Sequence, residues 1–249
     1  MEKLIIISGT TGGTGQEIVK RCYHKGIEDF NTIALYRDEK KFIKFFGNFD
    51  DLKENSIIPF KWEFSGNFNG IDKLTRLLQL CCPSIITFIH TAYEIKPIEK
   101  IGNIGYENIC KNISCNVTGI VMFIDFLINY ATKHNIKLNI FNMDSGAAYH
   151  PLKGWGLYSA GKAYINMFFR TIQLESSGIN VVTYEPGVID TPMQKTIRET
   201  NTSVFEQAGE FISYYVNGKL NSPSDIAEDI FNRFIKKWDV CNFSTSIKG

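Results

Sequence analysis

The sequence lacks an excess of charge of either sign. Its 27 Lys and Arg residues stand against 26 Asp and Glu residues, which leaves a formal net charge of +1 over 249 residues. Proteins that bind nucleic acid usually carry a basic excess gathered on one face, because the phosphate backbone must be neutralised. We therefore expect no nucleic acid among the partners of this protein.

Regularly spaced cysteines are also missing. No two cysteines have the C-x-x-C spacing, and none stands at a ligand spacing from a histidine. Structural zinc sites and disulfide frameworks both need such pairs. The pattern predicts no metal site, no disulfide framework and a reducing compartment, the cytoplasm. The cysteines are Cys22, Cys81, Cys82, Cys110, Cys115 and Cys241.

Long hydrophobic runs are absent as well. The longest apolar stretch, residues 119–131, contains Asp125 and is shorter than the roughly 20 residues that cross a bilayer as a helix. The N-terminal MEKLIII meets glycines almost at once, which leaves no room for a secretory signal. We expect a soluble protein with no membrane partner.

The sequence does contain a regular alternation of short apolar runs and segments with helical spacing. Such alternation builds right-handed βαβ units and a parallel sheet with helices on both faces. We therefore predict an α/β fold with a doubly wound parallel sheet of the Rossmann type, as a single domain over residues 1–249. Strands are predicted at residues 4–7, 32–36, 56–60, 85–89, 138–141 and 181–184, and helices over 16–26, 70–82 and 162–178.

No regular pattern follows Pro186 until residue 222. An irregular stretch of that size inside a compact domain is usually functional. Residues 188–221 are therefore predicted to form a substrate loop that acts as a lid. A last helix is predicted after Ser222, which caps it, with Pro223 at its first position and Asp225 completing a capping box.

Glycines stand between the first predicted strand and the first helix, in the stretch IIISGTTGGTGQEI. Backbone N–H groups and a helix N-terminus there would suit an anion such as a dinucleotide pyrophosphate. Two spacings fit. Gly9, Gly13 and Gly15 give G-x-x-x-G-x-G, whereas Gly9, Gly12 and Gly15 give G-x-x-G-x-x-G. The stretch alone does not choose between them.

Tyr158 and Lys162 lie four residues apart in a predicted helix, so they share one of its faces. Ser145 precedes Tyr158 by 13 residues (158 − 145) and follows a predicted strand, at the sheet edge where ligands of open α/β folds bind. A phenol with a reference pKa of ~10 relays protons poorly at neutral pH unless a nearby ammonium favours the phenolate. Lys162 is predicted to supply that ammonium. Tyr158 could then pass a proton to or from a bound group that the Ser145 hydroxyl also hydrogen-bonds.

The glycine stretch and the spacing of Ser145, Tyr158 and Lys162 together resemble the short-chain dehydrogenase/reductase family, of the compact type. GWGLYSAGKAYINMFF and EPGVIDTPMQKTIRE are most similar to its sepiapterin reductase and benzil reductase subgroup. The resemblance implies that Lys162 also holds the nicotinamide ribose and that Asn116 connects this lysine to solvent. The cofactor-binding residues that it implies are Gly9, Thr11, Gly13, Thr14, Gly15, Arg37, Glu63, Phe64, Ala92, Tyr158, Lys162, Pro186, Gly187, Val188, Ile189 and Thr191.

The end of the second predicted strand indicates which cofactor binds. An acidic side chain there would repel a 2′-phosphate on the adenosine ribose, but Tyr36 stands at that place and Arg37 follows it. We therefore expect NADP, as NADPH. The resemblance also implies that Glu63 replaces an adenine-binding aspartate of the family and that Gly12 stands where many members carry a basic residue.

Two stretches depart from the family pattern. His90, Thr91, Ala92 and Tyr93 stand where the family typically has two asparagines, an alanine and a glycine. Tyr93 thus places a ring where a glycine usually lets the backbone pass close to the cofactor. Gly161 stands where a small hydroxyl residue is usual, and this loss of volume should be tolerated.

These features predict an oxidoreductase that reduces a small-molecule ketone or diketone with NADPH. Aromatic and apolar loop residues indicate a bulky apolar substrate. Two alternatives stay open, a non-catalytic NADP(H)-binding redox sensor and an extended-type sugar-nucleotide epimerase or dehydratase, which the second glycine spacing permits. The resemblance also implies a homodimer or homotetramer. The loop residues are Tyr93, Tyr149, Trp155, Met193 and Phe205.

Overall fold

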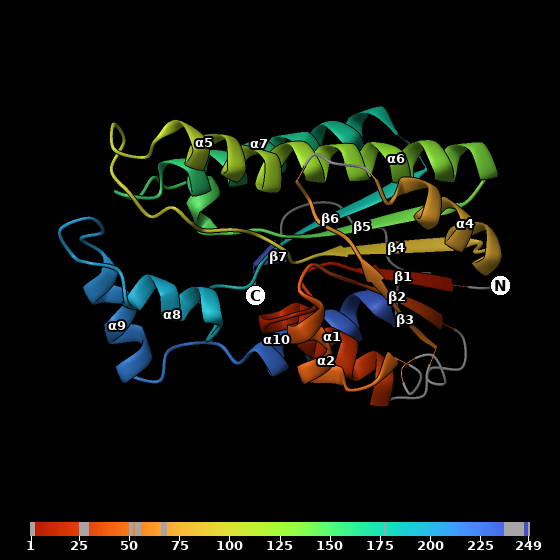
Figure 1. Cartoon of the computed structure of the whole chain (residues 1–249), viewed down its shortest axis with the longest axis horizontal. Coiled ribbons are helices and arrows are strands. Elements are labelled where there is room, and N and C mark those ends of the chain that lie inside the picture. Colours follow the sequence, from red (N-terminus) through yellow and green to blue (C-terminus); the bar gives the residue numbers. More distant parts are fainter. Residues whose placement is uncertain are drawn as a thin grey trace.

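The computed structural model describes residues 3–24, 30–49, 52, 56–65, 69–176, 178–236 and 247–248, and their strands and helices alternate (Figure 1). The strands are β1 (Lys3–Ile7), β2 (Phe30–Tyr36), β3 (Ile57–Lys61), β4 (Ile85–His90), β5 (Lys137–Met143), β6 (Ile179–Glu185) and β7 (Ile247–Lys248). The α-helices are α1 (Gly13–His24), α2 (Glu39–Phe46), α4 (Ile71–Cys81), α5 (Tyr106–Ile113), α6 (Gly119–His134), α7 (Gly156–Glu175), α8 (Pro192–Arg198), α9 (Ala208–Val216) and α10 (Pro223–Ile230). Three shorter helical turns are η1 (Ser114–Thr118), η2 (Gly146–Ala148) and η3 (Phe231–Ile235).

In the described part of the chain, the strands form one sheet in the order β3-β2-β1-β4-β5-β6-β7, and every neighbouring pair is parallel. The chain first winds outward from β1 to β3 and then crosses back to β4 on the other side of β1. This reversal leaves a crevice at the carboxyl ends of β1 and β4, where open α/β sheets bind their ligands. The predicted doubly wound parallel sheet is confirmed.

Alternation along the buried strands directs side chains to both faces of the sheet. In β1, Leu4 and Ile6 pack into a core with residues of α4, α6 and α7. Ile5 and Ile7 pack into a second core with residues of α1, α2 and α10. Figure 1 shows the corresponding two helix layers, with α4, α5, α6 and α7 on one side of the sheet and α1, α2 and α10 on the other. Burial on both faces explains why these strands are apolar throughout.

Helix α6 belongs to a longer helical run than the apolar stretch suggested, because η1 joins it to α5. The run Tyr106–His134 has 29 residues and a window of mean hydropathy 1.5, so by length and composition alone it could cross a membrane. In the described residues, however, Ile120, Phe123, Ile124 and Leu127 are 0% exposed and belong to the core on the sheet. These four apolar residues thus lie on the face of the helix that packs on the sheet.

The segment after β6 differs from its prediction as an irregular loop, because it contains α8 and α9. Thr191 caps α8 by accepting a hydrogen bond from the Gln194 N–H, and Pro192 occupies its first turn. The sequence therefore contained the signal for the start of α8, but the helix that follows it is short. Ser222 caps α10 and Pro223 stands at its first position, as predicted, but the Ser222 side chain accepts from the Ser224 N–H, so the predicted capping box with Asp225 is not found among the described residues.

Helix α7 ends at Glu175, three residues before the predicted end at Gly178, because Ser176 is already extended (φ −130°, ψ 103°).

Candidate active site

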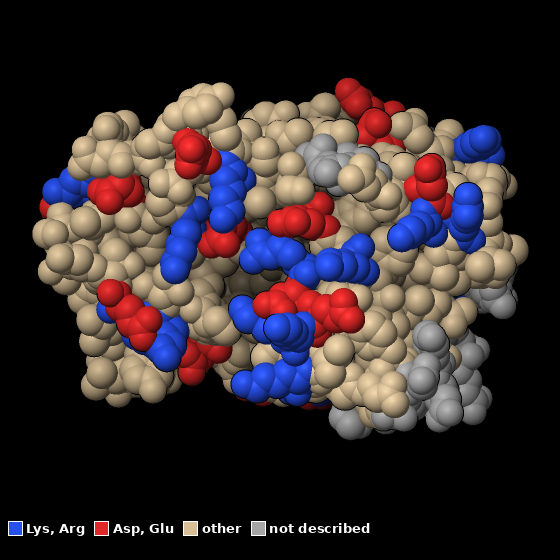
Figure 2. All heavy atoms as spheres, in the orientation of Figure 1, with Lys and Arg blue, Asp and Glu red and all other residues tan. Residues whose placement is uncertain are grey.

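A cavity of about 830 Å³ opens at the carboxyl ends of β1, β2, β4, β5 and β6. Every site residue predicted from the sequence lines it except Gly15, which is buried beneath the turn. Figure 2 shows a hollow on this face with acidic and basic side chains around it. The strand order therefore brings together residues as far apart in sequence as Gly9 and Thr191.

The glycine turn distinguishes the two spacings that the sequence left open. Gly9 has φ +74° and Gly13 has φ +54°, a region that favours glycine. A Cβ on Gly15 would lie 2.5 Å from both the Gly9 carbonyl oxygen and Thr91 Oγ1. A Cβ on Gly12 would meet nothing nearer than Pro192 Cγ at 3.8 Å. The structure thus needs glycine at positions 9, 13 and 15, which is the compact spacing.

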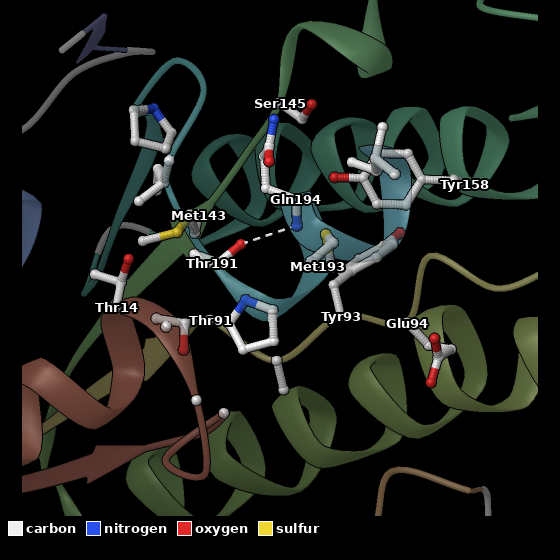
Figure 3. Close-up of a pocket in the computed structure, with 18 of the residues that line it drawn as sticks. Thr14, Thr91, Tyr93, Glu94, Met143, Ser145, Tyr158, Thr191, Met193 and Gln194 are labelled. Atoms are coloured by element: carbon white, nitrogen blue, oxygen red, sulfur yellow. Dashed lines mark hydrogen bonds between the residues drawn. The ribbon is translucent and has the colours of Figure 1, made fainter. Parts of the chain in front are cut away.

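The start of α1 has the features of an anion site. The helix begins at Gly13 and faces the cavity, so its first N–H groups and its dipole favour a negative group. Thr14 is 4% exposed and lines the same cavity, and its Oγ1 has no hydrogen-bond partner among the described residues (Figure 3). A buried hydroxyl without a partner is costly unless a ligand completes it. The turn therefore fits the pyrophosphate of a dinucleotide.

The end of the cavity beside β2 and α2 is basic. Tyr36, at the place where an acid would exclude a 2′-phosphate, stacks its ring on Phe42 of α2 with centroids 4.7 Å apart. Arg37 lines the cavity, and so do Lys41 and Lys44 of α2, which the sequence analysis missed. Their spacing of three residues on a helix just after Arg37 was a signal that could have found them. Glu63 and Phe64, which follow β3, complete this end.

Ser145 and Tyr158 meet at the end of β5. Ser145 caps η2 by accepting from the Ala147 N–H at 3.2 Å, which fixes its backbone beside α7. Burial raises the pKa of Tyr158 to about 12, and a hydrogen bond with Ser145 opposes that rise. The phenol is therefore protonated at neutral pH. The expected lowering of this pKa by Lys162 is not found, because burial has the largest effect on the phenol and the charge of Asp144 raises its pKa further.

Lys162 lies on the same face of α7 as Tyr158, as predicted. Its Nζ donates to the Met143 carbonyl oxygen at 2.7 Å and lies 6.0 Å from the centroid of the Tyr158 ring. Burial lowers the pKa of Lys162 to about 8, and the Asp144 carboxylate opposes this shift. Lys162 thus changes charge within the range of pH in which enzymes are assayed.

Asp144 is a site residue that the sequence analysis missed. It is 5% exposed, and its Oδ2 accepts from Asn166 Nδ2 at 2.6 Å and from the Tyr149 hydroxyl at 3.2 Å. Asn166 follows Lys162 by four residues on α7, so one helix face holds the tyrosine, the lysine and the side chain that binds this carboxylate. An acidic residue directly before a serine gives no specific signal in a sequence.

The residues that replace the family's asparagines still connect neighbouring strands. The Ser8 hydroxyl, after β1, lies 2.9 Å from His90 Nδ1, and it accepts from the Thr91 N–H at 3.1 Å. Thr91 Oγ1 donates to the Ser8 carbonyl oxygen at 2.7 Å. Burial, together with the charge of Lys162, lowers the pKa of His90 to about 3, so this imidazole is neutral. Serine, histidine and threonine thus brace β1 against β4.

Asn116 lies in the π-helical turn η1 and lines the cavity. Its amide binds the backbone of Glu94, donating to the carbonyl oxygen at 2.7 Å and accepting from the N–H at 2.9 Å. It therefore fixes the segment that follows β4. Its expected connection from Lys162 to solvent stays a prediction.

The side of the cavity near Trp155 is apolar and largely aromatic. Tyr93, Trp155 and Met193 line it, as expected. Phe205 lies behind Trp155, with stacked rings 4.9 Å apart, and Tyr149 is turned toward Asp144 instead. The sequence analysis missed other residues here, for which the irregular pattern after Pro186 gave little signal. These are Leu152, Gln194, Ile197, Phe211 and Tyr214.

No group of three or more His, Cys, Asp or Glu residues that could hold a metal ion occurs in the described residues. Five cysteines there are free thiols, and Cys241 lies outside the described residues.

The parallel sheet, its strand order and the cavity at the carboxyl ends of the strands define the class of fold, which is the Rossmann type. Residues 3–202 match the family model described as short chain dehydrogenase. The match covers most of the chain, so the protein belongs to the short-chain dehydrogenase family.

Its relatives include two named reductases. The chain is 29% identical to the benzil reductase ((S)-benzoin forming) of Bacillus subtilis (strain 168) over 231 residues, 90% of each protein. A shorter match, 47% identical over 66 residues, is to the sepiapterin reductase of Bos taurus and covers 26% of this chain and 25% of that protein.

Solved structures of the same fold hold either cofactor. An actinorhodin polyketide ketoreductase variant with NADPH has a TM-score of 0.74 at 21% identity, covering 93% of this chain and 89% of that chain. A 4-hydroxyisoleucine dehydrogenase complexed with NADH has a TM-score of 0.75 at 19% identity, covering 100% and 98%.

Proposed function

We propose that the protein reduces the carbonyl group of a ketone or diketone with NADPH. The observation that carries the proposal is that Ser145, Tyr158 and Lys162 line one cavity together with the glycine turn. The name of the Bacillus subtilis relative, benzil reductase, supports a diketone as the first substrate to test.

The chain supplies the proton and the electrostatic support for this reaction. When bound, the nicotinamide cofactor would supply the hydride for the carbonyl carbon. Tyr158, protonated because burial raises its pKa to about 12, would give its proton to the carbonyl oxygen. The Ser145 hydroxyl would hydrogen-bond the same oxygen as negative charge develops on it. The ammonium of Lys162 would stabilise the phenolate left on Tyr158.

Different parts of the cavity would hold different parts of the cofactor. The glycine turn and Thr14 suit its pyrophosphate, Lys162 its nicotinamide ribose, and Glu63 its adenine. The turn at Pro186, Gly187, Val188, Ile189 and Thr191 would lie beside the nicotinamide.

The proposal is tested by titrating the purified protein with NADPH and following tryptophan or NADPH fluorescence. Benzil is then added, and NADPH consumption is followed by absorbance. Tight binding followed by turnover is the expected result. Tight binding without turnover on a panel of ketones and diketones would contradict the reductase and favour the redox sensor, while absence of binding would contradict both.

Lys162 predicts the pH dependence of the reaction. Its pKa is lowered to about 8, so the ammonium is present below that pH and lost above it. We expect kcat/KM for reduction, which reports the free protein, to be level toward neutral pH and to fall about tenfold per unit above pH about 8. A level profile to pH 10 would contradict this assignment of Lys162.

Arg37 predicts the choice between the two cofactors. A guanidinium binds a phosphate with charge-assisted hydrogen bonds. Arg37→Ala should therefore weaken NADPH binding by roughly 10- to 100-fold while NADH binding changes little. Arg37→Lys keeps the charge but not the fork of donors, so its affinity for NADPH should lie between those of the original protein and Arg37→Ala. Equal losses of affinity for NADPH and NADH would contradict the proposed contact.

The aromatic lining supports a bulky apolar substrate. Trp155 and Phe211 have ring centroids 5.4 Å apart, and Trp155 also contacts Tyr158 at 5.2 Å. Flat aromatic surfaces next to the reacting tyrosine suit an aryl ketone better than a small polar one. Turnover of benzil compared with that of diacetyl measures this preference directly.

We also propose a cytoplasmic location and a homodimer or homotetramer that pairs through the long helices. Three side chains of α7 that a partner could cover are more than half exposed, Tyr164, Met167 and Leu174. Analytical ultracentrifugation measures the oligomeric state, and a monomer at micromolar concentration would contradict the pairing.

A further inference from the structure

Tyr93, the aromatic residue of the HTAY stretch, lies directly over the catalytic lysine. Lys162 Nζ is 3.9 Å from the centroid of the Tyr93 ring, closer than to the Tyr158 ring at 6.0 Å. A cation at that distance over a ring face is attracted by the ring's quadrupole. Tyr93 also meets Tyr158 edge to face, with centroids 5.4 Å apart, and Figure 3 shows the two rings close together in the cavity. One ring therefore contacts both proposed catalytic side chains of α7.

The hydroxyl of Tyr93 is not what holds the ring there. Its Oη is buried and has no hydrogen-bond partner among the described residues. Burial raises the pKa of Tyr93, and the charges of Tyr158 and Asp144 add to that rise, so the phenol stays neutral. The contact with Lys162 is thus made by the face of a neutral ring.

Gly161, the other departure from the family pattern, provides the space for this hydroxyl. A Cβ on Gly161 would lie 2.7 Å from Tyr93 Oη, a distance that forces something to move. The next nearest Tyr93 atom, Cζ, would be 3.7 Å away, which is an ordinary contact. The hydroxyl oxygen of Tyr93 therefore fits in its place because position 161 has no Cβ.

The charges that face Lys162 come from several elements. Asp144, after β5, raises its pKa, and burial lowers it by more. His90 of β4 is neutral, and the Tyr158 phenol is protonated. The Met143 carbonyl oxygen binds one N–H of the ammonium at 2.7 Å. None of these neighbours carries a positive charge. The Tyr93 ring therefore covers the ammonium without competition from another cation among them.

We propose that Tyr93 is a positioning residue that holds the Lys162 ammonium in place with its ring face, and that Gly161 is required because of the Tyr93 hydroxyl. The consequence for turnover rests on the proposed function, whereas the contact itself does not.

The pairing is tested with Gly161→Ala in two backgrounds. Alanine inside a helix ordinarily stabilises it relative to glycine. With Tyr93 present, we expect the opposite, a lower Tm and a loss of at least about tenfold in kcat/KM, because the new Cβ displaces the ring. In the Tyr93→Phe background the colliding oxygen is gone, and Gly161→Ala should cost less than about twofold. Equal losses in both backgrounds, or none in either, would overturn the pairing, and a Gly161→Ala protein that folds only together with Tyr93→Phe would support it.

The positioning role is tested without turnover, by NMR of lysine labelled with ¹³C at Cε in the cofactor-free protein. The Lys162 signal is identified by its loss in Lys162→Arg. Tyr93→Leu keeps an apolar side chain but removes the ring quadrupole, so the pKa of Lys162 should fall by about one unit. Tyr93→Phe keeps the ring and should leave that pKa near its original value. An unchanged pKa in Tyr93→Leu, or an equal fall in Tyr93→Phe, would overturn the role.

The two proposals fail separately. If the protein binds NADPH but turns over no carbonyl compound, the lysine titration and the Tm of the Gly161 variants still decide whether Tyr93 positions Lys162. If turnover occurs, the fall of kcat/KM at basic pH should begin at lower pH in Tyr93→Leu and at the original pH in Tyr93→Phe. A pH profile that neither substitution changes would contradict the positioning role and leave the proposed function standing.

Discussion

Tyr158→Phe should lower kcat for carbonyl reduction by roughly 10³-fold and leave NADPH binding within about twofold of the original value. The substitution removes one hydroxyl from a side chain that is 7% exposed and packed between the rings of Tyr93 and Trp155. The ring contacts remain, so the cavity keeps its shape. The proton for the carbonyl oxygen is lost, because the phenol is the group that stays protonated beside Ser145.

The measurement is single-turnover reduction at saturating NADPH, with fluorescence titration for binding. Tyr164→Phe is the matched control, because Tyr164 lies on the same helix, is 52% exposed and does not line the cavity. It should react at the original rate. Reductase activity retained in Tyr158→Phe would sink the assignment of Tyr158 as the proton donor.

Gly15→Ala should weaken NADPH binding by roughly 100-fold. Its Cβ would lie 2.5 Å from the Gly9 carbonyl oxygen and from Thr91 Oγ1, so the turn between β1 and α1 would have to open. That displacement would move the N–H groups that face the cavity and the Thr91 contact with Ser8.

Gly12→Ala is the control for this prediction. Its Cβ would have 3.8 Å to the nearest atom, Pro192 Cγ, and should leave binding within a few-fold. Isothermal titration with NADPH compares the two variants, and circular dichroism checks that both are folded. Equal losses would contradict the compact spacing and restore the alternative spacing through Gly12.

Much of the fold could be predicted because the signals are local. The apolar runs marked the six longer strands to within a few residues, since strands buried on both faces cannot alternate with polar residues. Helix α8 was missed because its signal consists of Thr191 followed by a helix of only seven residues that begins at Pro192, too few to show a period. The end of α7 was wrong for a related reason, since Gly178 is a good stop signal but the backbone at Ser176 had already left the helix.

In the candidate site, too, the features that depend on local spacing could be predicted and those that depend on distant segments could not. Ser145, Tyr158 and Lys162 could be placed together because their spacing on one helix and one strand end fixes their geometry. The raised pKa of Tyr158 could not be predicted, because its burial depends on Tyr93, which the fold brings from the end of β4 to the turn of α7 that holds Trp155 and Tyr158. Likewise the sequence showed Tyr93 and Gly161 as two separate departures, 68 residues apart (161 − 93), and only the structure joins them through one oxygen atom.

The third apolar cluster has a consequence for how this protein could change. Phe205, Ala208 and Ile197 pack with Trp155 in a cluster separate from the two cores that flank the sheet, and Figure 1 shows α8 and α9 beyond the ends of the strands. Tyr158 belongs to the same cluster, but the glycine turn does not, so substitutions in these helices can reshape the cavity near Trp155 while the glycine turn stays where it is. New ligand preferences can therefore arise here by small steps, while the two cores that flank the sheet are inherited unchanged.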